Sequence, residues 1–430
     1  MVDAKKKKIV SIIFLLCSIS AAISLTITIL NQTDFSSGTF TSTFFNTTSG
    51  ALELNRTVFT GNYSSQVFDA GSSSSWYSLS WTPDRCIQCE LADNQTVETG
   101  YSIVTNMTGN VLLMHFNNNS AQGENSTLFK DYSLMGNNGT CAAQSCPSHN
   151  LTGRFNQAYT FDGKDDNITL GDTLESTING NHTIAVWIYP TANASETIID
   201  KYNPTSGKRQ WGVTYRGDFI MSRYGALNGA TYRQYVTDTD NFPIRNWYHV
   251  VLVADPANDI YHFYLNGTEI SGSEAGTGNI TLVPDSNEPT RIGSGGGLND
   301  YNFNGTMDEI AIWNRTLSAQ EISDLYARGA MYLNFSVQSC DDASCSGESY
   351  TALTNSPGQT SQTLSLTTNR YIQFKAFLTT ESLSITPKLY NVTITYSETY
   401  VPPVPEWSTV AMILILTISL TGFYFISKQN

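Results

Sequence analysis

The stretch Thr183-Ile-Ala-Val-Trp-Ile-Tyr189 is apolar on both faces, so a strand with this sequence must be covered on both sides. Short runs rich in β-branched and aromatic residues are typical of inner strands of a β-sandwich. Two further runs of this kind are Tyr248–Ala254 and Tyr261–Leu265, and the latter leads directly into the turn Asn266-Gly267. The centre of the chain is therefore predicted to be an all-β sandwich.

Strands separated by Gly, Asn and Asp turns extend outward from this centre, over residues 109–330. A single short helix is predicted near the end of that region. Ser318 can cap it, and Glu321 can complete a capping box. The helix is expected to end at Gly329, and its apolar face comprises Ile322, Leu325 and Tyr326.

The same region contains an ordered series of short motifs. The series is Asn110–Phe116, Asp131-Tyr-Ser133, Gly136–Thr140, Phe161-Asp-Gly163, Ile184–Pro190, Asn246–Val250, Tyr264–Gly267, Arg291-Ile-Gly293, Phe303–Ile310 and Trp313–Ile322. In this order the motifs resemble the concanavalin A-like, laminin-G-type jelly rolls. The resemblance implies a jelly-roll fold. It leaves the activity open, because lectin-like, adhesive and glycan-degrading members share that scaffold.

Members of this family often hold a structural calcium ion near the point where the first and last strands meet. By position in the motifs, the resemblance suggests Asp162 and Asp308 as its ligands, with backbone carbonyl groups completing an oxygen shell. The alternative is that Asp162 shapes a turn and Asp308 caps a strand.

Catalysis is not expected. A retaining glycosidase needs two carboxylates about 5 Å apart, and laminarinase-like relatives place them on one face of a single strand. In the comparable strand, Met307–Trp313, Asp308 and Glu309 are predicted to point to opposite faces. Four tyrosines could line a sugar platform in the loops: Tyr215, Tyr224, Tyr232 and Tyr235. Core or edge packing is the favoured explanation for most of them, so the ligand-binding residues remain unknown.

The flanks of the jelly roll resemble two halves of one small β-sandwich found in large prokaryotic exoproteins. The first half is predicted at 36–105, with Gln66–Gly71 and Ser74–Trp81, and the second at 331–398, with Asn369–Phe377 and Pro387–Tyr396. Neither flank has enough strands to bury a core alone, and surface turns accept inserted domains. The jelly roll at 109–330 is thus predicted to be inserted into this sandwich. Two independent small modules are the alternative.

Six cysteines lie in three close pairs: Cys86 with Cys89, Cys141 with Cys146, and Cys340 with Cys345. An even number in an exported chain predicts disulfide bonds, although their connectivity is open. Zinc is the alternative for Cys86 and Cys89, whose spacing suits a metal site.

Both ends of the chain carry apolar segments. Residues 1–30 combine Lys5–Lys8 with an uncharged run, which predicts a signal peptide or a retained signal anchor. Residues 404–430 combine Val404-Pro-Glu-Trp407 with an apolar run and Lys428, which resembles an archaeal or bacterial sorting signal with a transmembrane helix. A plain stop-transfer anchor is the alternative. The middle of the chain is predicted to lie on the extracellular face of the membrane.

Charge and sequons agree with this location. Without the terminal lysines and Asp3 the chain has 18 basic and 36 acidic residues, which argues against nucleic acid and anionic lipid as partners. Many Asn-X-Ser/Thr sequons predict glycosylation, among them Asn46, Asn62, Asn106, Asn138, Asn167, Asn193, Asn304 and Asn391.

The predicted function is adhesion or recognition at the cell surface, with a glycan or another surface protein as the partner. The alternatives are a structural envelope protein and, third, a glycoside hydrolase. Exposed aromatic side chains around one loop cluster would favour recognition, and a broad apolar patch would favour assembly.

Overall fold

The computed structural model describes residues 24–174, 180–203, 208–217, 220–225, 232–238, 242–258, 260–277, 287–295, 301–354 and 356–398. Within these ranges no helix has the length and apolar character needed to cross a bilayer. The predicted C-terminal segment 404–430 and residues 1–23 of the predicted N-terminal segment lie outside the described residues.

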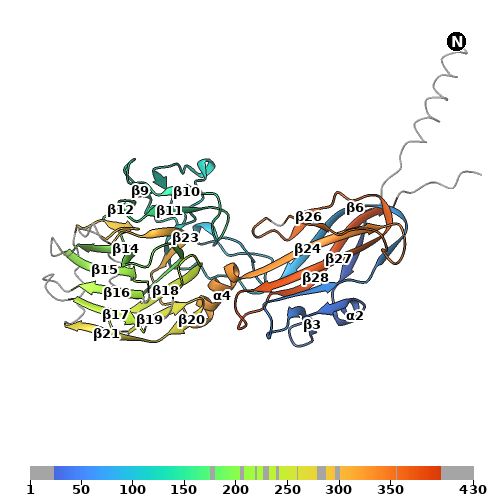
Figure 1. The fold of residues 1–430 in the computed structure, drawn as a ribbon, viewed down its shortest axis with the longest axis horizontal. Coiled ribbons are helices and arrows are strands. Elements are labelled where there is room, and N and C mark those ends of the chain that lie inside the picture. Colours follow the sequence, from blue (N-terminus) through green and yellow to red (C-terminus); the bar gives the residue numbers. More distant parts are fainter. Residues whose placement is uncertain are drawn as a thin grey trace, which may run out of the picture.

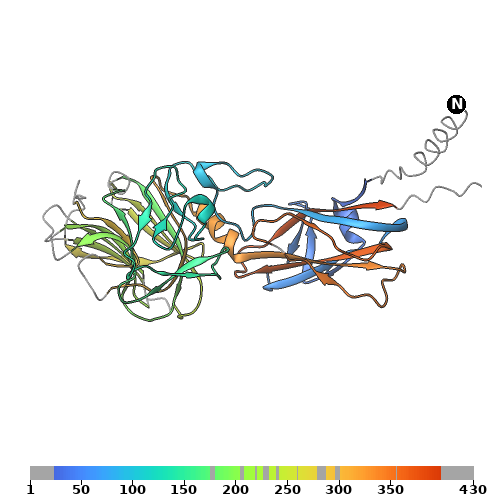
Figure 2. The same ribbon diagram turned by 90° about the horizontal axis from the view of Figure 1, so that it is seen from above.

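The described residues form two lobes that lie end to end, with helix α4 (Ala319–Ala330) at their junction (Figures 1 and 2). The first lobe is a jelly roll made of two facing sheets, B and C. The second lobe, hereafter the small sandwich, is built from residues 24–83 and 331–398. The linker, residues 84–109, connects the small sandwich to the first strand of the jelly roll.

Sheet B is antiparallel, with strand order β10-β11-β23-β13-β18-β19-β20, and β7 also pairs with β23. The long strands β13, β18 and β23 are buried along almost their whole length, as the apolar runs in the sequence predict. The strands of sheet B are β7 (Asn110–Met114), β10 (Ser148–Asn150), β11 (Ala158–Asp162), β13 (His182–Pro190), β18 (Tyr248–Asp255), β19 (Ile260–Leu265), β20 (Thr268–Ile270) and β23 (Asn304–Trp313).

Sheet C faces sheet B and has the order β21-β17-β16-β15-β14-β22-β12-β9-β8. Its strands are β8 (Leu128–Phe129), β9 (Gly139–Thr140), β12 (Ile168–Gly171), β14 (Glu196–Asn203), β15 (Lys208–Tyr215), β16 (Ile220–Gly225), β17 (Tyr232–Thr237), β21 (Gly272–Thr277) and β22 (Thr290–Ile292). Between the two sheets lies one continuous apolar core, which includes Phe161, Trp211, Phe263 and Phe303. The all-β sandwich predicted from the sequence is confirmed.

The outer face of sheet B is covered by α4 and the linker. Ser318 and Glu321 form the predicted capping box: the Ser318 hydroxyl accepts from the Glu321 N–H at 3.3 Å, and the Glu321 carboxylate accepts from the Ser318 N–H at 2.8 Å. The predicted apolar face of the helix packs against outward side chains of sheet B such as Ala185 and Trp313. This cover means that sheet B has no open outer face at the junction.

The helix does not end at Gly329, as the sequence suggested. It continues to Ala330 and passes directly into β24 (Met331–Cys340). Gly329 is needed for close packing instead, because a Cβ atom there would lie 2.6 Å from the Trp187 ring and 3.0 Å from the Arg154 guanidinium.

Replacing Gly329 by alanine is therefore expected to lower the free energy of unfolding by about 1–3 kcal/mol through overpacking, despite the better helix propensity of alanine. Urea unfolding measures the effect. Gln320→Ala, at an exposed position of the same helix, should change stability by much less. Equal stability of Gly329→Ala and the parent chain would contradict the packing argument.

The small sandwich is one antiparallel sheet folded on itself, in which strands from both flanks of the jelly roll pair with one another. β6 pairs along most of its length with β28, and β24 pairs with β27. Its strands are β1 (Ser24–Ile29), β2 (Thr39–Thr41), β3 (Thr43–Asn46), β4 (Ala51–Leu54), β5 (Thr60–Ser64), β6 (Phe68–Pro83), β24, β25 (Thr351–Ala352), β26 (Ser361–Thr363), β27 (Asn369–Thr380) and β28 (Lys388–Glu398). Short helices α2 (Gln32–Ser36), η1 (Asp93–Gln95) and η2 (Ser120–Gln122) lie outside the sheets.

The two flanks also share a core. The Trp81 ring, from before the jelly roll, packs 4.5 Å from the Phe335 ring, from after it. Other members alternate between the flanks, such as Tyr63 beside Phe374. The chain thus leaves the small sandwich after β6, builds the jelly roll, and returns through α4.

Strand β1 corrects the prediction for the N-terminal segment. The uncharged run was expected to form one hydrophobic helix as far as residue 30. Residues Ser24–Ile29 instead pair with β28, from Ser24 opposite Ser397 to Ile29 opposite Val392. The physical reason is their alternation: Leu25, Ile27 and Ile29 turn inward, and the residues between them are exposed.

The six cysteines form disulfide bonds, as the sequence predicted, and the connectivity that the sequence left open is local: Cys86–Cys89, Cys141–Cys146 and Cys340–Cys345. Cys86 and Cys89 are bonded to each other, so the zinc alternative for them is not adopted. Their loop lies in the linker at the junction of the lobes, where it shapes the backbone that contacts α4.

Candidate functional site

The two predicted calcium ligands do not lie at one site. Asp162 is the last residue of β11 and is paired with Asn304. Asp308 is four residues further along β23, roughly 13 Å away at the usual strand rise, and is fully buried. The Asp308 carboxylate accepts a hydrogen bond from the Phe155 N–H at 2.8 Å.

Asp162 instead lies beside Asp165 and Asp166, with carboxylate oxygens within 4.8 Å of one another. In the same turn, the Asp162 carboxylate accepts from the Lys164 N–H at 2.8 Å. The oxygen donors of this turn suit a calcium ion, whereas Asp308 cannot contribute to it. Calcium at Asp162 stays a prediction, with these two neighbours as its partners.

Asp308 and Glu309 do not point to opposite faces of sheet B, and that prediction is wrong. The register of β23 against β13 shifts between Ala185 and Trp187, and Glu309 adopts a left-handed φ of 48°. This β-bulge adds one residue to β23 and turns both carboxyl groups toward the outer side of the sheet. There the Glu309 carboxylate accepts from the Leu91 N–H of the linker at 3.0 Å.

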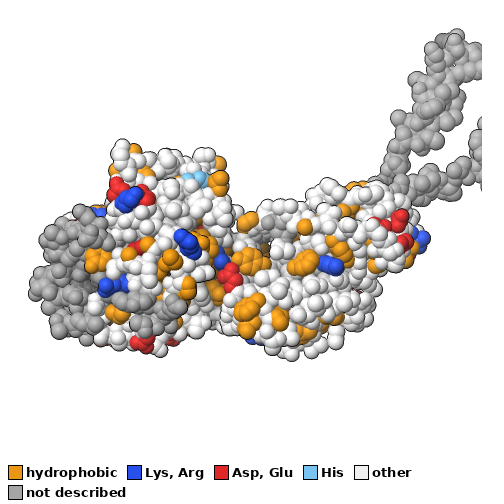
Figure 3. Space-filling model, viewed as in Figure 1, with side chains coloured by type: hydrophobic (Ala, Val, Ile, Leu, Met, Phe, Trp, Pro, Cys, Tyr) orange, Lys and Arg blue, Asp and Glu red, His pale blue; other side chains and the backbone are white. Residues whose placement is uncertain are grey.

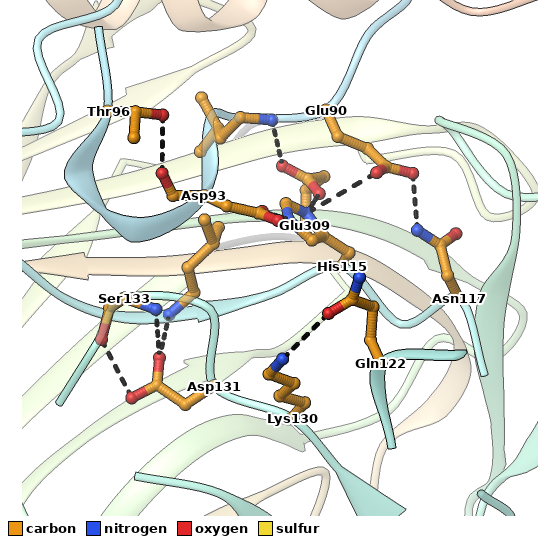
Figure 4. A network of polar contacts seen from close by, with 12 residues as sticks. Glu90, Asp93, Thr96, His115, Asn117, Gln122, Lys130, Asp131, Ser133 and Glu309 are labelled. Carbon is orange, nitrogen blue, oxygen red and sulfur yellow. Dashed lines mark hydrogen bonds and ion pairs between the residues drawn. The ribbon is translucent and has the colours of Figure 1, made fainter. Parts of the chain in front are cut away.

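The bulge brings Glu309 into a cluster with His115, Glu90 and Asp93, hereafter the polar cluster (Figure 4). His115 follows β7, Glu309 lies on β23, and the other two belong to the linker. The His115 Nδ1 atom contacts the Glu309 carboxylate and lies 4.0 Å from Glu90 Oε2. On the opposite side of the ring, Nε2 lies 2.7 Å from Asp93 Oδ1.

The Glu90 carboxylate of the polar cluster also accepts hydrogen bonds from residues outside the cluster. Glu90 Oε1 accepts hydrogen bonds from the side-chain amides of Asn117, at 2.7 Å, and Asn156. His115 and Glu309 are buried, and Glu90 is mostly buried. The cluster therefore joins the linker to two strands of sheet B through charged groups that have little contact with water.

The pKa values of His115, Glu90 and Asp308 are all raised, but for different reasons. Burial alone lowers the pKa of His115, but the Glu309 charge and the hydrogen bonds to Asp93 and Glu309 outweigh it, so the pKa lies well above its usual range. Burial, followed by the nearby Glu309 charge, raises the pKa of both Glu90 and Asp308. Shifted pKa values are frequent at functional sites, although structural charge clusters show them too.

The cavity that adjoins the polar cluster at Glu309 is small. The cavity beside Glu309 has a volume of about 10 Å³ and is closed by the linker, α4 and sheet B. That volume holds about one water molecule.

A second candidate is an aromatic cavity of about 210 Å³ at the junction of the lobes. It lies where the end of β6, the linker, the start of β24 and the turn 356–360 meet. Trp81, Tyr101 and Tyr332 supply aromatic rings, and Gln88, Asn334 and Gln359 supply amide groups. Aromatic rings with a few polar groups are the usual lining of a ligand site. Tyr101 and Tyr332 are both partly exposed.

The tyrosines suggested as a sugar platform do not form one in the described part of the chain. Tyr215 is fully buried, and its ring packs against Phe242. Tyr235 packs against Tyr261 and Phe263 in the jelly-roll core. The side chains of Tyr224 and Tyr232 lie outside the described residues.

The predicted glycosylation sites are compatible with attachment, since none of the eight asparagines is buried. Asn106, Asn138 and Asn193 are exposed. Glycosylation itself stays a prediction.

The polar cluster and the aromatic cavity were not predicted from the sequence. His115 could have been noticed, since it shares the outward side of its strand with Leu113 and is a charged group in an apolar run. Glu90 and Asp93 do not stand out in the sequence, because their position beside His115 depends on the path of the linker. The aromatic cavity joins segments more than 200 residues apart and has no local pattern.

Residues 162–323 match the model of the concanavalin A-like lectin/glucanases superfamily. No curated protein sequence matches the chain.

Among solved structures, the binding domain of Paraclostridial Mosquitocidal Protein 1 is 14% identical, with a TM-score of 0.39 over 55% of this chain and 62% of that one. Trypanosoma rangeli sialidase in complex with sialic acid is 15% identical, with a TM-score of 0.40 over 56% and 36%. Domain 4 of AbnA, a GH43 extracellular arabinanase from Geobacillus stearothermophilus, in complex with arabinotriose, is 17% identical, with a TM-score of 0.37 over 50% and 98%. The chain covers less than two thirds of the first two structures.

The superfamily match spans the region from the end of β11 into α4, which includes strands of both facing sheets. The chain therefore contains a jelly-roll domain of the concanavalin A-like, laminin-G type.

Proposed function

We propose that this chain is a non-catalytic recognition protein of the outer cell surface that binds glycans. The observation that carries the proposal is the aromatic cavity at the junction, on a chain whose jelly roll matches a lectin and glucanase superfamily. Sugar rings stack their apolar faces on aromatic side chains, and their hydroxyl groups pair with amides. The cavity is smaller than the roughly 300–1,000 Å³ of drug-sized ligand sites, so we expect it to take one terminal sugar residue.

The proposal excludes hydrolysis at the jelly-roll carboxylates. Asp308 and Glu309 are buried under the linker, and Glu309 is engaged with His115 and Leu91. A glycosidase of this fold needs an open acid pair. Release of reducing sugar from a bound glycan by the purified chain would overturn this part of the proposal.

The alternative function is that of a structural envelope protein. The distribution of exposed hydrophobic side chains bears on the choice between the two functions. On the face shown in Figure 3, hydrophobic side chains lie in small separate groups. Assembly through a broad apolar patch would require a continuous one. This arrangement favours recognition.

The test is binding of the purified full-length chain to a broad glycan array. We expect a defined class of glycans to bind, and Tyr101→Ala to weaken binding by about 2- to 10-fold, because one specific aromatic ring contact contributes about 0.5–1.5 kcal/mol. Tyr77→Ala is the matched control, since Tyr77 is an exposed tyrosine of the small sandwich outside the cavity. It should bind as the parent chain does.

Absence of binding to any glycan would move the proposal to the structural alternative. Glycan binding that is equal in Tyr101→Ala and the parent would place the site elsewhere on the chain. Repeating the array with calcium and with a chelator tests the prediction of calcium at Asp162, Asp165 and Asp166, and an Asp162→Asn variant separates that site from others.

A further inference from the structure

The polar cluster contains more negative charge than its own side chains neutralise. Glu90, Asp93 and Glu309 surround a single base, His115. The nearest guanidinium, that of Arg328, is used elsewhere: it binds the Glu98 carboxylate at 2.7 Å and the Glu90 carbonyl oxygen. Asp308, the next residue along β23, adds a fully buried carboxyl group whose Oδ1 atom has no hydrogen-bond partner among the described residues.

The orientation of the three innermost groups is that of metal ligands. His115 Nδ1, Glu309 Oε1 and Glu90 Oε2 face a common point and lie within 4.8 Å of one another. Each group presents one atom to that point while its other polar atom is held from behind. Glu309 Oε2 is held by the Leu91 N–H, and Glu90 Oε1 by Asn117.

His115 shows the same division between its two nitrogens. Its Nε2 atom lies 2.7 Å from the Asp93 carboxylate, so a hydrogen on Nε2 is donated to Asp93, and the Nδ1 atom faces the two glutamates. A metal-bound histidine typically donates its other ring N–H to a carboxylate in this way, which fixes the tautomer. In the metal-free chain the Nδ1 proton is donated to Glu309, and a divalent cation would take the place of that proton.

We propose that Glu90, His115 and Glu309 bind one divalent transition-metal ion of the zinc class, with Asp93 as the positioning residue of His115. Zinc lies about 2.0–2.2 Å from nitrogen and carboxylate oxygen ligands. The ligand atoms must then lie about 3–3.5 Å apart. The His115 Nδ1 and Glu309 Oε1 atoms, which are in hydrogen-bond contact, would therefore move apart, and Glu90 Oε2, which lies 4.0 Å from Nδ1 at the partly exposed edge of the cluster, would move closer. The mixture of imidazole and carboxylate favours zinc over calcium, which prefers oxygen alone.

The bound ion would hold the linker against sheet B of the jelly roll. Its three ligands come from the linker, from the residue after β7 and from β23, so one ion would bind together three segments that are distant in the sequence. This role is independent of glycan binding at the aromatic cavity.

The test is zinc binding by the purified full-length chain after removal of metals, measured by competition with a chromogenic chelator. We expect one ion per chain, and His115→Gln to lower the affinity at least 100-fold. Asp93→Asn should lower it by about 10–100-fold, as loss of an outer partner of a metal-bound histidine does. His262→Gln is the matched control, because His262 pairs with the single carboxylate of Glu269 at 2.6 Å on the surface, and it should bind as the parent does.

A second measurement covers variants that fold poorly. Cobalt added to the parent chain should give the visible absorption bands of a four-coordinate site, and Glu90→Gln, altered only at the partly exposed ligand, should lose them. Failure of the parent chain to bind zinc at micromolar free concentration would overturn the proposal. Equal affinity of the parent and His115→Gln would overturn it as well.

Discussion

Arg328→Ala is expected to lower the free energy of unfolding by about 3–5 kcal/mol, the usual cost of removing one partner from a buried ion pair. Arg328 lies on α4, and its side chain is buried. Its Nη2 atom lies 2.7 Å from Glu98 Oε1. The same guanidinium donates to Thr105 at 3.3 Å and to the Cys89 sulfur at 3.0 Å. Without it, Glu98 would remain as an uncompensated charge in a mostly buried site.

In Arg328→Ala the loss of stability should affect the linker before the whole chain unfolds. Because Arg328 contacts three linker side chains, we expect Arg328→Ala to accelerate proteolysis within residues 84–109 relative to the rest of the chain. Urea unfolding and limited proteolysis followed by mass spectrometry measure the two effects.

Arg370→Ala is the matched control. Arg370 also binds one carboxylate through two nitrogens, at 2.7 and 2.8 Å from Asp69, but both partners are largely exposed. Exposed pairs contribute little because water screens them. If the two variants lost the same stability, burial of the Arg328 pair would not be what holds the linker.

Glu196→Gln is expected to remove a fall in stability that the parent chain shows between about pH 4.5 and pH 8. Glu196 is buried at the start of β14, and burial raises the pKa of its carboxyl group to about 8, with a backbone hydrogen bond from Asn304 opposing the shift. Its Oε2 atom has no hydrogen-bond partner among the described residues. The folded chain therefore keeps this carboxyl group protonated at neutral pH.

The direction of this pH dependence follows from the number of protons that the folded and the unfolded chain bind. Above about pH 4.5 the carboxyl group of the unfolded chain ionises while that of the folded chain does not, so each rise in pH favours unfolding until the folded group also ionises near pH 8. We expect the parent to lose about 2–3 kcal/mol over this window, less than the full shift implies, because some solvent screening remains. In Glu196→Gln the group stays neutral, so the stability difference between variant and parent should grow with pH.

Urea unfolding of both chains from pH 5 to pH 9 measures this difference. Glu53→Gln is the control, since Glu53 is equally buried but accepts hydrogen bonds from Asn46 and Ser49. It should lower stability without producing a difference that grows across the window. A Glu196→Gln chain whose stability runs parallel to the parent at all pH values would contradict the buried, protonated state. Burial lowers the pKa values of His182 and His249 to about 4 and about 3, so these residues make stability rise with pH up to about pH 6.5 in parent and variant alike, and the difference between the two chains isolates Glu196.

The sequence predicted the β-sandwich and helix α4 because their signals are local. The apolar runs of β13 and β18 need cover on both faces, and the capping box needs only Ser318 and Glu321. The error at Gly329 arose because a glycine near a helix end usually marks its end, whereas here the Trp187 ring requires it. That contact joins residues far apart in the chain and has no sequence pattern.

The candidate sites were less predictable for the same physical reason. A strict two-residue period separated Asp308 from Glu309, and a single bulge reversed that conclusion. Bulges depend on the register of the partner strand, which alternation along one strand does not reveal. The motif match likewise placed Asp162 and Asp308 in one site, although the pairing of β11 with β23 separates them by four residues.

The pairing of β1 with β28 has a mechanical consequence. Ser24 lies opposite Ser397, so the two chain ends of the described fold leave the small sandwich side by side, at the end away from α4 (Figures 1 and 2). A pulling force applied between these ends would peel β1 from β28 one residue pair at a time, the geometry in which antiparallel strands resist least. The chain enters and leaves the jelly roll through the ends of β6 and β24 at the opposite end of the sandwich, so the jelly roll would carry no load until the sandwich itself had opened.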